Sequence, residues 1–297
     1  MGEKILVPLD GSSEAETALL YAAEITAGLG SEIFLVSVSE SQVSDIDNLF
    51  STYLMNISEK MESQIKTHGA KGTPEVSSDI LLGDPATKIL RYAIEKDVDL
   101  IILAIRGVAG KGPRLLGNIA ARILRSTKKP VLLIRTPPDD DAVEQKKLVK
   151  KILLPLDGSK TGESAVLPTE ILALAFDAEI VFFQAGETIT VSGGFDDGQF
   201  HAEPTQQDLD KRKAFGLAYL EKVREPLKER GLKTSSVLVL GPAPDVIIDY
   251  AEENSIDLIA MSTHGRSGIG RWVFGSVTDK VLHAGDTPLL VVRATAK

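Results

Sequence analysis

The most informative gap in the 297-residue sequence is cysteine, of which there is none. This absence excludes disulfides, thiolate nucleophiles and zinc sites built on sulfur, and it is typical of a reducing compartment, so we expect a cytoplasmic protein. No apolar run approaches the roughly 18 residues that a membrane-spanning helix needs. Positive charge is also in short supply, because the formal net charge at pH 7 is −9. That balance argues against a nucleic-acid partner and against anionic membranes.

Residue groups that support metal binding or acid–base catalysis are missing as well. The 4 histidines are scattered without metal-ligand spacing, so we predict no metal site. His264 would be the natural acid or base, but the sequence brings no second ionisable partner near it. We therefore assign no catalytic residue.

A glycine-rich stretch near the end of the chain is the clearest positive feature. It follows the run 257–261, typical of a buried strand, and precedes 277–284, typical of a short helix. Ser276 and Asp279 match a capping box at the start of that helix. Such a strand, loop and helix start suit phosphate, because loop amides and the helix dipole attract anions. A tight connection without a ligand is the alternative, and the Gly-Lys-Ser/Thr ending of a P-loop is absent.

Elsewhere, short β-rich runs alternate with segments of helical period, which predicts an α/β fold with doubly wound parallel sheets. The strands predicted in the first half are 5–9, 33–38, 76–82, 99–103 and 131–134. The helices predicted between them are 13–28, 49–68, 85–96 and 119–126. Ser13 and Glu16 match a capping box at the start of the first helix.

The second half of the chain repeats the first. Residues 5–12 recur almost unchanged at 152–159, and further matches at a constant spacing pair Gly83 with Gly241, Asp99 with Asp257, Gly107 with Gly265, Gly117 with Gly275 and Pro130 with Pro288. We therefore predict two domains, 1–137 and 149–297, joined by a linker at 138–148. The second repeat carries a longer polar insert, 186–210, whose composition predicts a mobile segment, either a lid or a disordered loop.

With these features the sequence resembles the universal stress protein family (UspA-like) in its tandem form. The family's mark is Gly-x2-Gly-x9-Gly-Ser/Thr after the fourth strand. Here Gly265 is followed by nine residues and then Gly275 and Ser276, with Ser262 in the place of the leading glycine. The resemblance implies two tandem five-stranded sheets of the adenine nucleotide alpha hydrolase-like, Rossmann-like type, paired through their last strands about a pseudo-twofold axis.

The resemblance also implies a site for ATP, or for AMP or ADP, with or without magnesium. Carried over residue by residue, the site in the second repeat comprises Pro155, Asp157, Ala185, Ser262, Thr263, His264, Gly265, Arg266, Ser267, Gly268, Gly275, Ser276, Val277 and Thr278. The corresponding residues of the first repeat are Pro8, Asp10, Val38, Gly107, Gly110, Gly117 and Asn118. That loop departs further from the family pattern, because Ala104 replaces the leading glycine and Asn118 the final serine. Asp10 and Asp157 also fit a simple turn before a helix.

The function implied is a nucleotide-dependent sensor or interaction protein of the stress response, acting on an unknown protein partner. We expect at most slow ATP hydrolysis, because the sequence does not bring a metal carboxylate, a nucleophile-orienting group and a γ-phosphate cation together. One alternative is a nucleotide-free dimerisation or interaction module. Another is an adenylyl-transferring enzyme of the same broad fold, although its His-x-Gly-His and first-strand Ser-Gly-Gly motifs are absent. The chain would pair its own domains, as a monomer or as a homodimer of such pairs.

Overall fold

The computed structural model describes residues 4–40, 44–70, 74–106, 116–136, 148–186, 205–265 and 274–294. Within them strands and helices alternate in two successive series: the first copy, with strands β1 to β5, and the second copy, with strands β6 to β10. The predicted linker, apart from its last residue, lies outside the described residues. So do five predicted site residues, namely Gly107, Gly110, Arg266, Ser267 and Gly268.

The two copies contain the same order of strands and α-helices, and the second copy adds a 3-10 helix after its first strand. The strands of the first copy are Lys4–Pro8 (β1), Glu32–Ser39 (β2), Val76–Leu82 (β3), Leu100–Arg106 (β4) and Val131–Thr136 (β5). Its helices are Ser13–Leu29 (α1), Ser44–Thr67 (α2), Pro85–Glu95 (α3) and Asn118–Ser126 (α4). The strands of the second copy are Lys151–Pro155 (β6), Glu179–Gly186 (β7), Thr234–Leu240 (β8), Leu258–Ser262 (β9) and Leu289–Val292 (β10). Its helices are the 3-10 helix Gly162–Ala165 (η1), then Val166–Phe176 (α5), Gln206–Glu229 (α6), Ala243–Glu253 (α7) and Ser276–Ala284 (α8).

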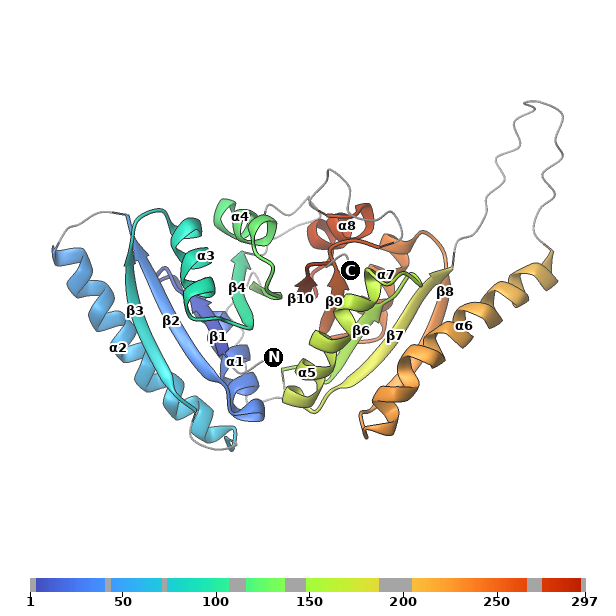
Figure 1. The fold of residues 1–297 in the computed structure, drawn as a ribbon, viewed down its shortest axis with the longest axis horizontal. Coiled ribbons are helices and arrows are strands. Elements are labelled where there is room, and N and C mark those ends of the chain that lie inside the picture. The colour runs from blue at the N-terminus through green and yellow to red at the C-terminus, as the bar shows by residue number, and fades with distance from the viewer. Residues whose placement is uncertain are drawn as a thin grey trace, which may run out of the picture.

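The described strands form one ten-stranded sheet in the order β3-β2-β1-β4-β5-β10-β9-β6-β7-β8 (Figure 1). Neighbouring strands are parallel within each copy, whereas β5 and β10 pair antiparallel with Leu132 opposite Leu290. The prediction of two doubly wound five-stranded sheets, joined through their last strands as a pseudo-twofold pair, is therefore confirmed. Pairing of β5 with β10 also removes two apolar sheet edges from solvent.

Helices cover both faces of the sheet, and each face has its own core. One core joins α1, α2, α5 and α6 to the sheet through residues such as Ile25, Met61 and Phe176. The other joins α3, α4, α7 and α8 to the opposite face through residues such as Ile123 and Val281. Each core contains residues of both copies, so burial of apolar surface continues across the β5–β10 seam.

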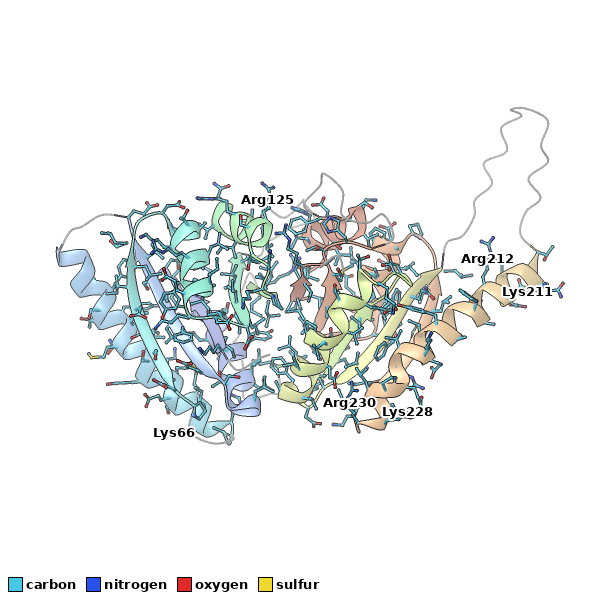
Figure 2. The ribbon with its side chains drawn as sticks, in the orientation of Figure 1. Lys66, Arg125, Lys211, Arg212, Lys228 and Arg230 are labelled. Carbon is cyan, nitrogen blue, oxygen red and sulfur yellow. The ribbon has the colours of Figure 1, made fainter. Side chains whose placement is uncertain are left out.

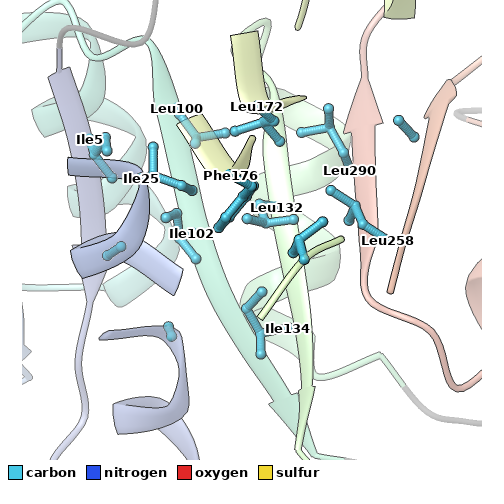
Figure 3. Packing of buried hydrophobic residues seen from close by; sticks show 14 of the residues in the cluster. Ile5, Ile25, Leu100, Ile102, Leu132, Ile134, Leu172, Phe176, Leu258 and Leu290 are labelled. Carbon is cyan, nitrogen blue, oxygen red and sulfur yellow. The ribbon is translucent and has the colours of Figure 1, made fainter. Parts of the chain in front are cut away.

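On the α1 side of the seam the two copies pack closely. Figure 3 shows Leu132, Leu290 and Phe176 meeting in the shared core, although they come from β5, β10 and α5. The rings of Tyr21 and Phe176 meet edge to face, with centroids 6.5 Å apart. Gly28 is needed here, because a Cβ at this position would lie 2.3 Å from the carbonyl oxygen of Ala175.

A reciprocal pair of arginines holds the seam on the other side. Arg135, in β5, is buried, and it donates from Nε to the carbonyl of Thr287 at 3.1 Å and from Nη2 to that of Leu282 at 2.7 Å. Its counterpart Arg293 is exposed and donates to the carbonyls of Arg125 and Thr127. Each arginine thus binds the C-terminal end of the other copy's last helix, where a cation is favoured.

The predicted N-terminal ends of several helices were wrong. Ser12 rather than Ser13 caps α1, through a bond from the amide of Ala15. Gly275 rather than Ser276 occupies the cap of α8, without a side-chain hydrogen bond, so the predicted Ser276–Asp279 box does not form. The helix predicted at 49–68 begins at Ser44, since an acidic opening suits a helix N-terminus.

The predicted insert 186–210 was also drawn too wide. Gly186 belongs to β7, and α6 begins at Gln206, because a polar sequence can still form the first turns of a helix that packs farther along. Residues 187–204, on which the prediction of a mobile segment mainly rests, lie outside the described residues.

Candidate functional site

The second copy contains a cavity of about 500 Å³ at the carboxyl ends of its strands. It lies where β6 is flanked by β7 on one side and β9 on the other, so successive chain connections leave β6 in opposite directions. Parallel sheets bind ligands at such a switch point. The predicted site residues that line the cavity are Pro155, Asp157, Ala185, Ser262, His264, Gly265, Gly275, Ser276, Val277 and Thr278.

Asp157 lies in the turn that follows β6 and lines the cavity. Its Oδ1 accepts hydrogen bonds from the amide of Ser159 at 3.0 Å and from the Ser159 hydroxyl at 2.6 Å. Ser159 in turn accepts a bond from the amide of Gly162 at the start of η1. The first copy repeats the same turn with Asp10 and Ser12. Both aspartates therefore serve as turn residues, as one of the two sequence interpretations required.

Gly265 lies directly against this turn. A Cβ on Gly265 would lie 2.1 Å from Oδ2 of Asp157, much closer than any real contact, so the position accepts only glycine without rearrangement. The carbonyl of Gly265 accepts a bond from the Thr161 hydroxyl at 2.9 Å. The loop that leaves β9 is thereby fixed to the loop that leaves β6.

The N-terminus of α8 opens toward the cavity. The amide of Gly275 donates to the carbonyl of Thr263 at 2.7 Å, and the hydroxyl of Thr278 donates to the carbonyl of Ser262 at 2.9 Å. These two bonds join the helix start to the end of β9. No side chain in the described part of the chain caps the helix. First-turn amides have no acceptor within their own helix, and here they adjoin Ser276 at the cavity wall. A helix end of this kind favours an anionic group.

Thr263 and His264, both predicted site residues, have different surroundings. Thr263 is buried and is not among the cavity-lining residues; its hydroxyl accepts a bond from the amide of Ala294 at 3.1 Å. His264 lines the cavity, and its Nδ1 lies 3.0 Å from the Thr263 hydroxyl. Thr263 thus joins the loop to the chain just after β10, whereas His264 forms part of the cavity wall.

Comparison with known proteins adds the decisive observation. The model of the universal stress protein family matches residues 1–135 and again residues 149–293. The chain belongs to the universal stress protein family. A universal stress protein of Synechocystis sp. is 26% identical over 316 residues, which cover 98% of this chain and 100% of that protein. One from Mycobacterium tuberculosis is 26% identical over 308 residues, or 97% and 96% of the two chains.

The fold is shared at full length with solved members of the family. The crystal structure of a universal stress protein from Archaeoglobus fulgidus has a TM-score of 0.68 and 19% identity, covering 99% of each chain. A universal stress protein of Pseudomonas aeruginosa also gives a TM-score of 0.68, with 19% identity over 98% of this chain and 93% of that chain. The tandem arrangement is therefore a property that this universal stress protein shares with relatives.

Several cavity residues were missed by the sequence reasoning. The apolar floor includes Leu156, Ile247 and Met261, all buried, and further lining residues are Gly162, Gly241, Pro242, Ala243, Pro244 and Lys280. The repeated glycines Gly83 and Gly241 were a usable signal for the segment around Pro242. Both have positive φ, 128° and 150°, at the turn before α3 and α7, which only glycine adopts readily.

In the first copy an ion pair joins the two helices that correspond to α7 and α8. Asp84 caps α3 by accepting a bond from the amide of Thr87, and Arg122 of α4 donates to both of its oxygens at 2.7 and 2.8 Å. The hydrogen bond from Arg122, followed by those from Thr87, lowers the pKa of Asp84 far below its usual range. The predicted residues Gly117 and Asn118 are exposed at the start of α4, with Gly117 rather than Asn118 at the cap. Pro8 and Val38 are half-buried at the ends of β1 and β2.

Some of the cations elsewhere on the described surface form ion pairs with acids close to them. Figure 2 labels six surface cations, and three of them pair with acids: Lys66 with Glu62, Lys228 with Glu225 and Arg230 with Glu170. Within the described residues no group of three metal-binding side chains gathers, and no helix is long and apolar enough to cross a membrane. The cavity of the second copy is therefore the feature on which a function can be argued.

Proposed function

We propose that the second copy binds an adenine nucleotide in the cavity at the ends of β6, β7 and β9, with the phosphates at the start of α8. The observation that carries the proposal is the junction of an apolar pocket with an uncapped helix N-terminus. A volume of about 500 Å³ is within the usual range for small-molecule sites. Ala185, Ile247 and Met261 offer apolar surface for a base, whereas Ser276 adjoins free amides for phosphate.

Ligand binding in this proposal controls shape or partner choice and does not drive fast chemistry. The α8 helix begins at the cavity and ends at the seam, where Arg135 of the first copy binds the Leu282 carbonyl. An anion at one end of α8 and a cation at the other both favour the same helix. Nucleotide occupancy would then be sensed by the opposite copy, as expected of a stress-response sensor. Magnesium enters only as a companion of the phosphates, and hydrolysis is expected to stay far below about 10 per second.

A second candidate function applies to the first copy alone. Its Asp84–Arg122 pair joins α3 to α4 without a ligand. This observation favours a nucleotide-free interaction module for that half, paired with a nucleotide-binding half. The cytoplasmic location, the division at 138–148 and any homodimer remain predictions from the sequence.

The test compares Ser276→Asp with the matched first-copy variant Asn118→Asp. Both substitutions place a carboxylate in the first turn of a helix, where it stabilises the helix, but only the first would oppose a bound phosphate. By titration calorimetry with ATP we expect Ser276→Asp to lose about 100-fold in affinity, as expected from losing charge-assisted bonds and adding repulsion. We expect Asn118→Asp to bind like the wild type. Equal losses, or no ATP binding by the folded wild type, would contradict the proposal.

A further inference from the structure

Lys280 lies beyond the Gly-x9-Gly-Ser pattern that ends at Ser276. It lies in α8, one turn after Ser276, and its side chain lines the cavity. Its surface is exposed, yet no ion pair joins it to an acid within the described ranges of the chain. Other surface cations, such as Lys228 and Arg230, meet glutamates nearby.

The first copy shows what this position does when an anion is supplied. Arg122 is the fifth residue of α4 (Asn118–Ser126), as Lys280 is the fifth of α8 (Ser276–Ala284). The acid that Arg122 binds, Asp84, is the cap of α3, and the cap of the equivalent helix α7 is Pro242. Both helices are 11 residues long, so the positions correspond. The second copy thus keeps the cation and lacks its internal carboxylate.

Pro242 also lines the cavity, so the missing carboxylate leaves an acceptor position open at the cavity itself. A cation beside an uncapped helix start is suited to several phosphate oxygens at once, because ammonium and amide donors then share one anion. The acids of α7 are Asp245 in its first turn, then Asp249, Glu252 and Glu253, and none of them forms an ion pair with Lys280 in the part of the chain that is described.

Building on the proposed function, we propose that Lys280 binds the phosphate chain of the nucleotide, in the role that the Asp84 carboxylate plays toward Arg122. In the first copy the internal carboxylate occupies the cation and closes the position. In the second copy proline leaves it to the ligand. The site therefore selects adenine nucleotides by their phosphates and favours ATP over AMP and AMP over adenosine.

The first experiment measures ATP, AMP and adenosine affinities for the full chain by titration calorimetry. Since Lys280 is exposed, we expect Lys280→Gln to weaken ATP binding by about fivefold, the upper end for a surface charge pair. Adenosine affinity should change by less than about twofold. Arg122→Gln, the matched variant in the first copy, should leave all three affinities at their wild-type values.

The second experiment installs the first-copy closure in the second copy. Pro242→Asp provides a helix cap and a carboxylate facing Lys280, whereas Pro242→Asn provides the cap alone. We expect both variants to melt at or above the wild-type temperature, but only Pro242→Asp to weaken ATP binding, by about 5-fold or more. In a Lys280→Gln background, Pro242→Asp should lose most of this effect.

The outcomes separate the two proposals. If the wild type binds ATP, AMP and adenosine equally, and Lys280→Gln changes none of them, the role of Lys280 is wrong while nucleotide binding stands. If Pro242→Asn weakens ATP binding as much as Pro242→Asp, loss of the proline rather than the new charge is responsible, and the inference also fails. If the folded wild type binds none of the three ligands, the proposed function itself is wrong.

Discussion

The two copies share a backbone design and differ where their third and fourth α-helices meet the strand ends. In the first copy Asp84 caps α3 and holds Arg122 of α4, whereas in the second copy Pro242 and Lys280 occupy those positions and line a cavity of about 500 Å³. The order of the strands, the turn aspartates and the positive-φ glycines Gly83 and Gly241 are the same. A repeated fold can therefore keep its frame while the corresponding helix residues form an internal ion pair in one copy and line a cavity in the other.

The arginines at the β5–β10 seam should give the largest difference in stability between matched variants of the two copies. Arg135→Ala removes a buried guanidinium from the end of α8 and leaves backbone carbonyls without their donor. We expect the free energy of unfolding to fall by about 2–4 kcal/mol. The pseudo-twofold partner Arg293 is exposed, so Arg293→Ala should cost less than about 1 kcal/mol. Urea denaturation of the two variants measures both values, and equal losses would show that the seam is more symmetric than the burial of these side chains indicates.

Gly265 offers the next largest effect. Gly265→Ala places a Cβ against Oδ2 of Asp157, so the loop or the Asp157 turn must move, at about 1–3 kcal/mol of stability. Because that turn lines the cavity, ATP affinity should fall as well. Gly117→Ala is the control, since no described atom lies within 4 Å of its added Cβ, and it should change stability by less than about 0.5 kcal/mol. Unfolding curves and ATP titrations of both variants that came out alike would contradict the close approach of Gly265 to Asp157.

The smallest expected effect is the pH dependence of the first-copy ion pair. The bond from Arg122 depresses the folded-state pKa of Asp84, so the pair stabilises the protein above the ordinary carboxyl pKa of 3.8 and loses this contribution as the pH falls toward the folded value. Asp84→Asn keeps a helix cap and removes the charge. Its stability deficit relative to the wild type should therefore be greatest near neutral pH and should shrink in acid.

A double-mutant cycle with Arg122→Gln isolates the pair. Unfolding measured from pH 7 down to pH 3 should give a coupling between the two positions that weakens with acid. A coupling that stays constant over this range would mean that the Asp84 carboxylate is not the titrating partner of Arg122.

The order of strands and helices could be predicted from the sequence because the patterns that indicate it are local and occur in both copies. The run at residues 5–12 and its repeat at 152–159 indicated two equal α/β units, and the loop around Gly265 indicated which strand ends line the cavity. Cap positions failed by one residue at Ser13 and Ser276, since neighbouring serines and glycines give nearly the same local pattern.

The remaining features depend on contacts between elements far apart in the chain. The bond between Asp84 and Arg122 spans 38 positions, and that between Arg135 and Leu282 spans 147. Neither has a spacing that a motif could express. Lys280 was missed because the sequence alone does not show that this exposed residue of α8 lines a cavity together with residues from β6, β7 and α7.

The most direct test of the account is to ask where an adenine nucleotide touches the chain. The full-length protein would be labelled with 8-azido-ATP under light, with and without excess ATP, and the labelled peptides identified by mass spectrometry. We predict ATP-protected labelling of second-copy peptides that carry cavity residues, such as Ala185 or Pro242 to Ile247. Labelling that ATP prevents equally well, or mainly, in first-copy peptides around Val38 and Asp84 would contradict the claim that one copy binds the nucleotide and the other is closed by its own ion pair.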